Sequence, residues 1–296
     1  MKILVTGAWK CTQEQQEQLE ARGHEIIKMS HEYAELPCAY EKIEGAICNG
    51  LFLHHPIEKF TSLKYIQLTS AGFDRVPMEY IEKKGIEIHN ARGVYSIPMA
   101  EFAVGGVLQL YKQSSYFYKN QMKQKWEKHR GLMEVCGKTV CIVGCGSVGN
   151  ECAKRFGAFG CKIIGVDLYP REDVAYKKIL SIEKLKEGIL ISDIVVLTLP
   201  LTKKTQHIMS RDIFETMKEG AVLVNIARGG VVDEQALQKV LKTKLHGAVL
   251  DVFEEEPLPK ESELWQMENV IITPHNSFVG EGNNGRLSDV IFSNLK

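Results

Sequence analysis

The sequence predicts an α/β fold of two domains, each built on a parallel β-sheet. The chain has 296 residues, and a single hydrophobic core usually stops growing beyond about 250 residues. Short apolar runs alternate with helical patterns along the chain, and continuous runs of this kind are typical of strands covered on both faces. A glycine-rich segment in the middle of the chain joins one such run to a helix.

That glycine-rich segment lies within Thr139–Asp167. The run Val140–Val143 leads into Gly144-Cys145-Gly146-Ser147-Val148-Gly149, and after a helical stretch the run Ile163–Val166 ends at Asp167. In this context the first glycine permits a tight turn, the second lets the backbone approach a pyrophosphate, and the third allows close helix–strand packing. Asp167 would accept hydrogen bonds from the ribose of NAD and repel the 2′-phosphate of NADP. A glycine-rich turn without a ligand is the alternative, but the full β-α-β context favours a dinucleotide site in a doubly wound Rossmann domain.

The carboxyl-terminal half continues the same alternation. The expected strands are Val140–Val143, Ile163–Val166, Ile194–Leu199, Ala221–Ile226, Gly247–Phe253 and Val270–Thr273. The expected helices, besides the one after the glycine turn, are Ser181–Glu187, Arg211–Lys218 and Glu234–Leu245. These strands would complete a Rossmann domain, which we expect at residues 94–276.

Weaker patterns of the same kind predict a smaller, flavodoxin-like α/β domain at the amino terminus. Its expected strands are Lys2–Thr6, Glu25–Ile27, Ala46–Cys48, Tyr65–Leu68 and Ile86–Ile88, with helices at Thr12–Arg22 and Met78–Lys83. Pro98–Lys123 predicts a long helix that joins the halves, and Gly285–Lys296 predicts a last helix that returns to the first domain. The smaller domain is therefore expected to be discontinuous, with residues 1–93 plus 277–296.

Composition argues against several kinds of partner. The formal net charge is zero, so no overall field attracts nucleic acid or an anionic membrane, and we interpret the basic range Lys119–Arg130 as a solvated connecting helix. No apolar stretch approaches the roughly 20 residues of a membrane span, and the amino terminus is typical of a first strand rather than a signal peptide. The eight cysteines form no CxxC pair, which indicates reduced thiols in the cytoplasm. No metal site is expected, because His54 and His55 have no companion ligands and we interpret them as loop residues.

Three residues that could perform chemistry follow predicted strands. Arg228, Glu256 and His275 each lie after the carboxyl end of a strand, where open α/β sheets place ligands. An arginine binds a carboxylate through two parallel hydrogen bonds, and a histidine beside a carboxylate can exchange a proton near neutral pH. Each residue also has a structural interpretation: Arg228 could pair with Asp233, Glu256 could belong to a solvated acidic loop, and His275 could be a packed side chain. Their joint position behind a dinucleotide fold favours hydride and proton transfer between a nicotinamide and a 2-hydroxy or 2-oxo acid.

The segments around these residues resemble the D-isomer-specific 2-hydroxyacid dehydrogenase family over nearly the whole chain. They are, in order, Gly137-Lys138-Thr139, GCGSVG with Asp167, TLPLTKKT at 198–205, NIARGGVVDE at 225–234, LDVFEEEPLP at 250–259 and NVIITPH at 269–275. The resemblance implies an NAD-dependent enzyme that interconverts a D-2-hydroxy acid and its 2-oxo acid. Arg228 would bind the substrate, and His275 with Glu256 would form the acid/base pair.

The same resemblance implies the remaining site residues. Contacts with NAD are implied for Gly144, Gly146, Ser147, Val148, Gly149, Asp167, Leu199, Pro200, Thr205, Ile226, Ala227, Arg228 and Asp251. The turn Ser70-Ala71-Gly72 would hold the substrate carboxylate through backbone N–H groups, and further substrate contacts are implied for Asn49, Gly50, Tyr95 and Arg228. The helix and arm at Pro98–Trp126 resemble the dimer contacts of the family, so a homodimer is expected.

Two features depart from the family pattern, and two other functions stay open. Asn276-Ser277-Phe278 replaces small apolar residues after His275, and Phe102 stands where a histidine or leucine is common. Formate dehydrogenases of the superfamily carry glutamine in place of glutamate, so Glu256 argues against that activity. An NAD(H)-sensing corepressor or scaffold on the same fold can retain all three residues. A match to the YxxxK motif of short-chain dehydrogenases, at Tyr80–Lys84, precedes the glycine turn, whereas that family has it afterwards.

Overall fold

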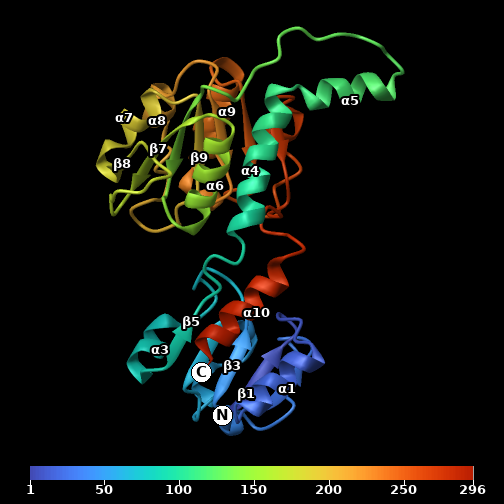
Figure 1. Cartoon of the computed structure of the whole chain (residues 1–296), viewed down its shortest axis with the longest axis vertical. Coiled ribbons are helices and arrows are strands. Elements are labelled where there is room, and N and C mark those ends of the chain that lie inside the picture. The colour runs from blue at the N-terminus through green and yellow to red at the C-terminus, as the bar shows by residue number, and fades with distance from the viewer. Residues whose placement is uncertain (296) are drawn as a thin grey trace. The chain divides into compact units, whose positions relative to one another are not determined.

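A computed structural model describes residues 1–295 of the chain, which divide into two compact units. Unit 1 contains Met1–Tyr95 and the chain from Gly280 on, and unit 2 contains Ser96–Val279. Each unit has its own parallel sheet with helices on both faces (Figure 1). The predicted α/β class is confirmed. Among residues 1–295, no helix combines the length and apolar character needed to cross a membrane.

Unit 2 is built on a sheet with the strand order β12-β11-β10-β9-β6-β7-β8. The strands are β6 (Thr139–Val143), β7 (Lys162–Asp167), β8 (Lys178–Ser181), β9 (Ile194–Leu197), β10 (Val222–Asn225), β11 (Gly247–Leu250) and β12 (Val270–Ile272). Every residue of β9, β10 and β11 is buried, which explains their continuous apolar runs. The order reverses between β6 and β9, and ligands of doubly wound sheets bind at the carboxyl ends of the strands beside such a switch point.

Strand β8 was not predicted. It reads Lys-Ile-Leu-Ser and lies partly exposed at the sheet edge, so it lacks the apolar run that marks the central strands. The bounds of the helix expected at Ser181–Glu187 are also wrong. Ser181 ends β8, and a 3₁₀ turn, η3 (Ile182–Lys184), precedes α7 (Leu185–Leu190).

Helices cover both faces of the unit 2 sheet (Figure 1). One face carries α4 (Ser96–Tyr111) and α6 (Ser147–Ala158), and the other carries α7, α8 (Arg211–Thr216) and α9 (Glu234–Thr243). Two short 3₁₀ turns, η4 (Gly229–Val231) and η5 (Glu263–Gln266), lie between these elements. A Cβ atom on Gly106 would lie 2.6 Å from Val249 Cγ1, so a glycine in α4 permits the close approach of this helix to β11.

The long helix expected at Pro98–Lys123 is two helices. Helix α4 ends at Tyr111, and α5 (Ser114–Met122) begins after Gln113, which has a left-handed φ of 52°. Neither glycine nor proline marks this break, so the sequence pattern continued across it. The solvated helix expected over Lys119–Arg130 is correspondingly wrong beyond Met122, because the chain from there to β6 forms no helix or strand.

Unit 1 has the strand order β2-β1-β3-β4-β5, which is the flavodoxin-like order. The strands are β1 (Lys2–Thr6), β2 (Glu25–Met29), β3 (Gly45–Cys48), β4 (Tyr65–Leu68) and β5 (Glu87–His89). The helices are α1 (Gln13–Ala21), α2 (Leu51–His54), α3 (Met78–Lys84) and α10 (Asn283–Asn294), with 3₁₀ turns η1 (Tyr40–Lys42) and η2 (Ile57–Lys59). His54, expected in a loop, is the last residue of α2. His55 is buried, with its Nδ1 3.0 Å from the Tyr40 hydroxyl.

Helix α10 packs on the sheet of unit 1 although it is far away in the sequence. Leu287 and Ile291 are buried with Ile3 and Trp9 in one apolar cluster. The Trp9 indole donates a hydrogen bond to Ser288 Oγ at 3.0 Å. The helix was expected at Gly285–Lys296, of which Lys296 lies outside the described residues.

Candidate active site

The three candidate catalytic residues follow neighbouring strands of unit 2. Arg228 comes after β10, Glu256 after β11 and His275 after β12, and these strands are adjacent in the sheet. Because the carboxyl ends of parallel strands meet at one edge, the structure gathers the three residues at the edge where such sheets bind ligands. Arg228 is half-buried, and its Nη1 donates a hydrogen bond to the Ala227 carbonyl at 2.7 Å.

His275 and Glu256 are in direct contact. His275 Nδ1 lies 2.9 Å from Glu256 Oε2, and Glu256 Oε1 accepts a hydrogen bond from the Phe253 N–H at 3.1 Å. A carboxylate at Nδ1 fixes the orientation of the imidazole and leaves Nε2 for a ligand. The two side chains are 43% and 37% exposed, so a ligand can reach them. His275 also has a left-handed φ of 50°, a strained conformation that is often found at functional sites.

A buried carboxylate holds the loop that carries His275. Asp251 is fully buried and accepts hydrogen bonds from the Thr273 hydroxyl at 2.6 Å and from the N–H groups of Asn276 and Ser277 at 2.7 and 2.9 Å. Asp251 was predicted as a cofactor contact, and its role in bracing this loop was missed. Its partners are mostly backbone groups, which leave no signal in the sequence.

The loops of Arg228 and Glu256 touch each other through their backbones. A Cβ atom on Gly229 would lie 1.8 Å from the carbonyl carbon of Phe253, so only glycine allows this approach. Buried Asn225 holds the same turn, since its Nδ2 donates to the Arg228 carbonyl and its Oδ1 accepts from the Ala227 N–H, each at 3.1 Å. The alternative partner of Arg228, Asp233, instead caps α9 by accepting a hydrogen bond from the Ala236 N–H.

Unit 2 contains a second histidine–glutamate pair that sequence reasoning did not find. His207 Nε2 lies 3.1 Å from Glu254 Oε1, and the two side chains are 45% and 40% exposed. His207 also has a left-handed φ, of 47°. Glu254 Oε1 accepts a further hydrogen bond from the Glu234 N–H. The exposed fractions and the left-handed histidine backbone resemble those of His275 and Glu256, but His207 contacts its glutamate through Nε2 and His275 through Nδ1.

The glycine turn has the shape that a dinucleotide requires. Gly144 has a φ of 99°, and a Cβ atom there would lie 2.6 Å from the Leu199 nitrogen. A Cβ atom on Gly149 would lie 2.1 Å from the Gly144 carbonyl oxygen, whereas nothing lies within 4 Å of one on Gly146. The two outer glycines therefore permit close packing and the middle one leaves open space, at the start of helix α6 with Ser147 and Val148 in its first turn. These residues fit a bound pyrophosphate.

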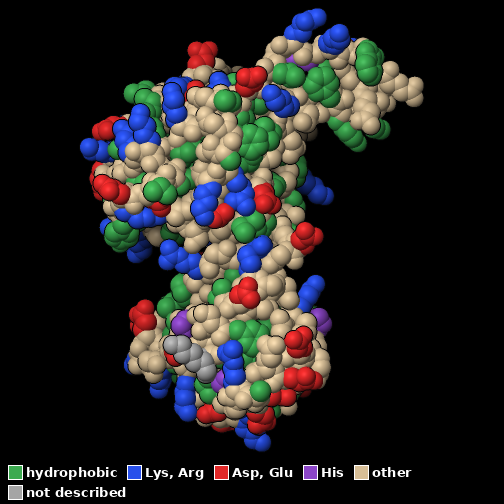
Figure 2. Space-filling view, viewed as in Figure 1, with side chains coloured by type: hydrophobic (Ala, Val, Ile, Leu, Met, Phe, Trp, Pro, Cys, Tyr) green, Lys and Arg blue, Asp and Glu red, His purple; other side chains and the backbone are tan. Residues whose placement is uncertain are grey.

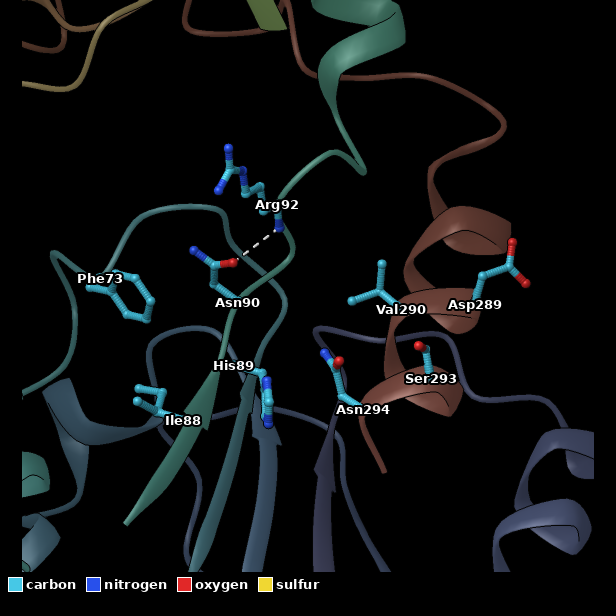
Figure 3. Close-up of a pocket in the computed structure, with 9 residues that line it drawn as sticks. All are labelled: Phe73, Ile88, His89, Asn90, Arg92, Asp289, Val290, Ser293 and Asn294. Carbon is cyan, nitrogen blue, oxygen red and sulfur yellow. Dashed lines mark hydrogen bonds between the residues drawn. The ribbon is translucent and has the colours of Figure 1, made fainter. Parts of the chain in front are cut away.

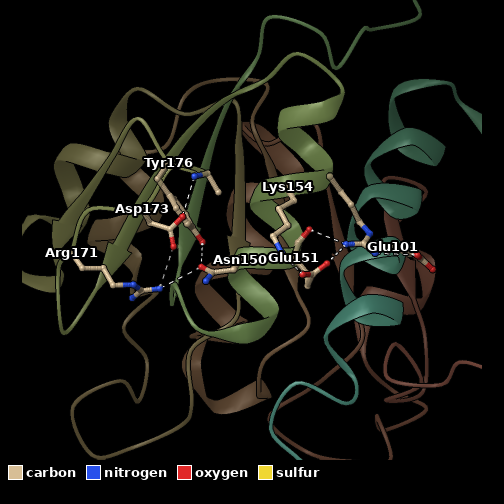
Figure 4. A network of polar contacts seen from close by, with 9 residues as sticks. Glu101, Asn150, Glu151, Lys154, Arg171, Asp173 and Tyr176 are labelled. Atoms are coloured by element: carbon tan, nitrogen blue, oxygen red, sulfur yellow. Dashed lines mark hydrogen bonds and ion pairs between the residues drawn. The ribbon is translucent and has the colours of Figure 1, made fainter. Parts of the chain in front are cut away.

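Asp167 and Arg171 both contact the glycine turn. Asp167 accepts hydrogen bonds from the Cys145 N–H at 2.7 Å and the Tyr169 N–H at 2.9 Å, one at each carboxylate oxygen. Each oxygen has a second lone pair that a ribose hydroxyl could use. Arg171 Nη2 donates to the Cys145 carbonyl at 2.5 Å. It also lies 3.5 Å from Asn150 Oδ1, as Figure 4 shows. A cation therefore lies beside the acid that was expected to repel a 2′-phosphate.

The other predicted cofactor residues line the same edge of the sheet. Leu199, Ile226 and Ala227 are buried after β9 and β10. The Thr205 hydroxyl is also buried and donates to the Pro200 carbonyl at 2.7 Å, so it closes the loop after β9.

In unit 1, Asn49 and Gly50 follow β3 and bind a carboxylate of the chain itself. Their N–H groups donate to Glu32 Oε1 at 2.7 Å and Oε2 at 2.6 Å, and Oε1 also accepts from the Thr6 hydroxyl at 2.7 Å. Sequence reasoning missed Glu32, because nothing in its local pattern indicates these contacts.

The turn Ser70-Ala71-Gly72 follows β4 at the same edge of the unit 1 sheet. The Ser70 hydroxyl donates to the Gly72 carbonyl at 3.0 Å. The Tyr95 hydroxyl donates to the Thr69 carbonyl, and burial raises the pKa of Tyr95. The predicted substrate-binding residues of unit 1 therefore lie at or contact the carboxyl ends of β3 and β4. In the same way, Arg228, Glu256 and His275 follow the carboxyl ends of strands in unit 2.

No cluster of three or more histidine, cysteine or acidic side chains within residues 1–295 is arranged to hold a metal ion. All eight cysteines are free thiols.

Comparisons with known proteins agree with this geometry. The family model described as "D-isomer specific 2-hydroxyacid dehydrogenase, NAD binding domain" matches residues 104–277, which lie within unit 2. The chain is 39% identical over 222 residues to the D-3-phosphoglycerate dehydrogenase of Methanocaldococcus jannaschii, an alignment that covers 74% of this chain and 42% of that relative. It is 37% identical over 225 residues to the hydroxypyruvate reductase of Thermotoga maritima, covering 74% of this chain and 72% of that relative.

A solved structure is similar over both units. It is the D-lactate dehydrogenase of Aquifex aeolicus complexed with NAD and lactic acid, with 25% identity, a TM-score of 0.79 and coverage of 98% of this chain and 93% of that one. The chain belongs to the D-isomer specific 2-hydroxyacid dehydrogenase family.

Proposed function

We propose that the protein interconverts a D-2-hydroxy acid and its 2-oxo acid, with unit 2 binding NAD and unit 1 acting as the substrate domain. The proposal rests on one observation: His275 contacts Glu256, and these two residues and Arg228 follow the adjacent strands β12, β11 and β10. This set supplies a cation for a carboxylate and a proton donor at the same edge of the sheet as the glycine turn. The aligned relatives support the same chemistry.

The residues of the chain would divide the work as follows. Arg228 binds the carboxylate and the carbonyl oxygen of the 2-oxo acid. His275 gives a proton from Nε2 to the forming alkoxide, and Glu256 stabilises the imidazolium that must be present beforehand. NAD(H), when bound, supplies or accepts the hydride. In the oxidising direction His275 takes the proton back, so reduction consumes a proton and oxidation releases one.

For the cofactor, we propose a preference for NAD(H) over NADP(H). Asp167 would face a 2′-phosphate with like charge, and the hydrogen bond that it accepts from the Cys145 N–H holds it at the glycine turn. Gly144, Gly146, Ser147, Val148 and Gly149 would hold the pyrophosphate.

We propose further that the protein is a cytoplasmic homodimer. The eight free cysteines fit a reducing compartment. Helix α5 and the segment after it carry exposed apolar side chains, among them Met122 and Trp126, which fit a surface that a second copy covers.

The activity is tested by the oxidation of NADH and NADPH in the presence of a panel of 2-oxo acids. We expect one or more acids to be reduced, with NADH preferred. A corepressor or scaffold would bind NADH without turnover, and a formate dehydrogenase would reduce none of the acids.

The catalytic histidine is tested by a pair of matched variants. His275→Ala should lower kcat by roughly 10²–10⁴-fold, the usual effect of a positioned acid/base group, with little change in the affinity for NADH. His207→Ala removes the histidine of the second pair and should retain kcat. Equal losses in the two variants would show that the role is assigned to the wrong residue.

A further inference from the structure

Two loops at the carboxyl edge of the unit 1 sheet present neighbouring backbone N–H groups. In one loop these N–H groups already donate to a carboxylate of the chain. After β3, the N–H groups of Asn49 and Gly50 both donate to the carboxylate of Glu32. After β4, the N–H groups of Ala71 and Gly72 donate no hydrogen bond to any group in residues 1–295. Of these two loops, only the second therefore leaves its backbone N–H groups available to a carboxylate from outside the chain.

The carbonyl groups of this second loop, in contrast, are all bonded. The Thr69 carbonyl accepts from the Tyr95 hydroxyl, and the Ser70 carbonyl accepts from the Ala91 N–H at 2.8 Å. The Ala71 carbonyl accepts from Asn90 Nδ2 at 2.7 Å, and the Gly72 carbonyl accepts from the Ser70 hydroxyl at 3.0 Å. The orientation of each peptide group in the turn is thus set by a donor.

The direction of the free N–H groups follows from these bonds. In a planar trans peptide the C=O and the N–H point in opposite directions. The carbonyls of Ser70 and Ala71 both point toward the segment Asn90–Ala91 after β5, so the N–H groups of Ala71 and Gly72 both point away from it. Successive N–H groups that face one side form a concavity that binds anions.

The Asn90 side chain contacts the second loop directly. Its Nδ2 holds the Ala71 carbonyl, and its Oδ1 accepts from the Arg92 N–H at 3.2 Å (Figure 3). Both ends of the amide are therefore occupied, which fixes the side chain between the loops that follow β4 and β5. Loss of Nδ2 would leave the Ala71–Gly72 peptide free to rotate.

We propose that Asn90 is a positioning residue for the substrate carboxylate. Through the Ala71 carbonyl it keeps the Gly72 N–H, beside the Ala71 N–H, directed at the incoming anion. The inference rests on the proposed function, with unit 1 as the substrate domain and with its Ser70–Gly72 turn, as the family resemblance implies, holding the carboxylate of a 2-oxo acid. Asn90 itself need not touch the substrate.

Asn90→Asp tests the proposal, since it keeps the size of the side chain but replaces the donor with a charged acceptor. Asn90→Ala removes the donor without adding charge. Ser293→Ala is the matched control, because Ser293 lines the same 580 Å³ surface pocket as Asn90 but lies on α10, away from the turn (Figure 3). For each protein we would measure KM and kcat with a 2-oxo acid, and the dissociation constants of NADH and, in the NADH complex, of oxalate.

We expect both Asn90 variants to raise KM and the dissociation constant of oxalate together, by about 3- to 10-fold for the loss of one neutral hydrogen bond. The rise should be larger for Asn90→Asp, because its charge repels the ligand. kcat, the affinity for NADH and the melting temperature should stay close to those of the Ser293→Ala control. An unchanged oxalate affinity in both variants, or a parallel loss of NADH affinity, would overturn the proposal.

Failure of the proposed function gives a different result. If the unmutated protein reduces no 2-oxo acid, the activity is wrong, but the oxalate titration still reports on the turn. If oxalate does not bind the unmutated NADH complex, the turn is not a carboxylate site and the role of Asn90 fails with it.

Discussion

At the scale of single residues, much of the candidate site consists of side chains that hold backbone. Asp251 braces the His275 loop, Asn225 braces the Arg228 turn, and Gly229 lets that turn touch the segment before Glu256. Reacting groups must keep their geometry closely. We therefore expect the bracing residues to affect activity although they carry no chemistry of their own.

For Arg228, a substitution can separate the effect of the positive charge from that of the planar guanidinium group. Arg228→Lys keeps the positive charge but loses the planar guanidinium that bonds a carboxylate twice. We expect kcat/KM to fall by roughly 10- to 100-fold, the effect of one lost hydrogen bond to a charged group. Steady-state kinetics with the preferred 2-oxo acid measures this, and activity close to that of the unmutated protein would contradict two-point binding.

The thiols give a second prediction at this scale. Burial raises the pKa of Cys141, Cys145 and Cys152 to about 12, so near pH 8 only about one in 10⁴ of each is the reactive thiolate. Cys136 is exposed and should react first with a thiol reagent. Unfolding should then release the buried thiols. A Cys136→Ser variant should lack the fast phase, and rapid native labelling of the three buried thiols would show that the glycine turn opens readily.

The sequence predicted the positions of the candidate catalytic residues at strand ends better than it predicted the residues that hold their loops. Arg228, Glu256 and His275 could be placed because each follows an apolar run, and the carboxyl ends of parallel strands share an edge. Glu32, Asn90 and the bracing role of Asp251 could not, because their partners are backbone groups in other loops.

At the scale of elements, one glycine controls the packing of α4 on β11. Gly106→Ala would bring a methyl group within 2.6 Å of Val249, and overpacking of this kind costs about 1–3 kcal/mol. Gly105→Ala, one residue earlier in the same helix, meets nothing within 4 Å and should be neutral or stabilise by up to about 1 kcal/mol. Thermal or denaturant unfolding of the two variants measures the difference. Equal stabilities would show that α4 shifts to accept the extra atom.

Sequence patterns missed two elements, an edge strand and a helix break, because the local signal for each is weak. Apolar runs mark strands that are covered on both faces, whereas β8 has only two apolar residues, Ile179 and Leu180, between Lys178 and Ser181 and was not found. The break between α4 and α5 depends on a left-handed Gln113, a residue that gives no turn signal. Such features depend on tertiary contacts rather than on local preference.

At the scale of the whole molecule, the exposed apolar surface of unit 2 predicts self-association. Figure 2 shows hydrophobic side chains gathered at α5 and the segment after it, where Trp126 is 97% and Met122 68% exposed. Light scattering should give twice the 33.4 kDa of one chain. Replacing both side chains by serine should yield monomers, whereas Val174→Ser, at another fully exposed site of unit 2, should not. A monomer at micromolar concentration would contradict the proposed homodimer.

The discontinuity of unit 1 has a consequence for how the chain is made on the ribosome. Unit 2 is one continuous segment, whereas unit 1 needs α10, which is translated after all of unit 2. At about 5–20 residues per second, the strands of unit 1 wait for about 10–40 s before α10 is synthesised. During that interval the apolar surface around Ile3 and Trp9, which Leu287 and Ile291 later cover, is open to chaperones and to neighbouring nascent chains. Unit 2 can therefore fold first, and unit 1 is completed only after α10 has been synthesised.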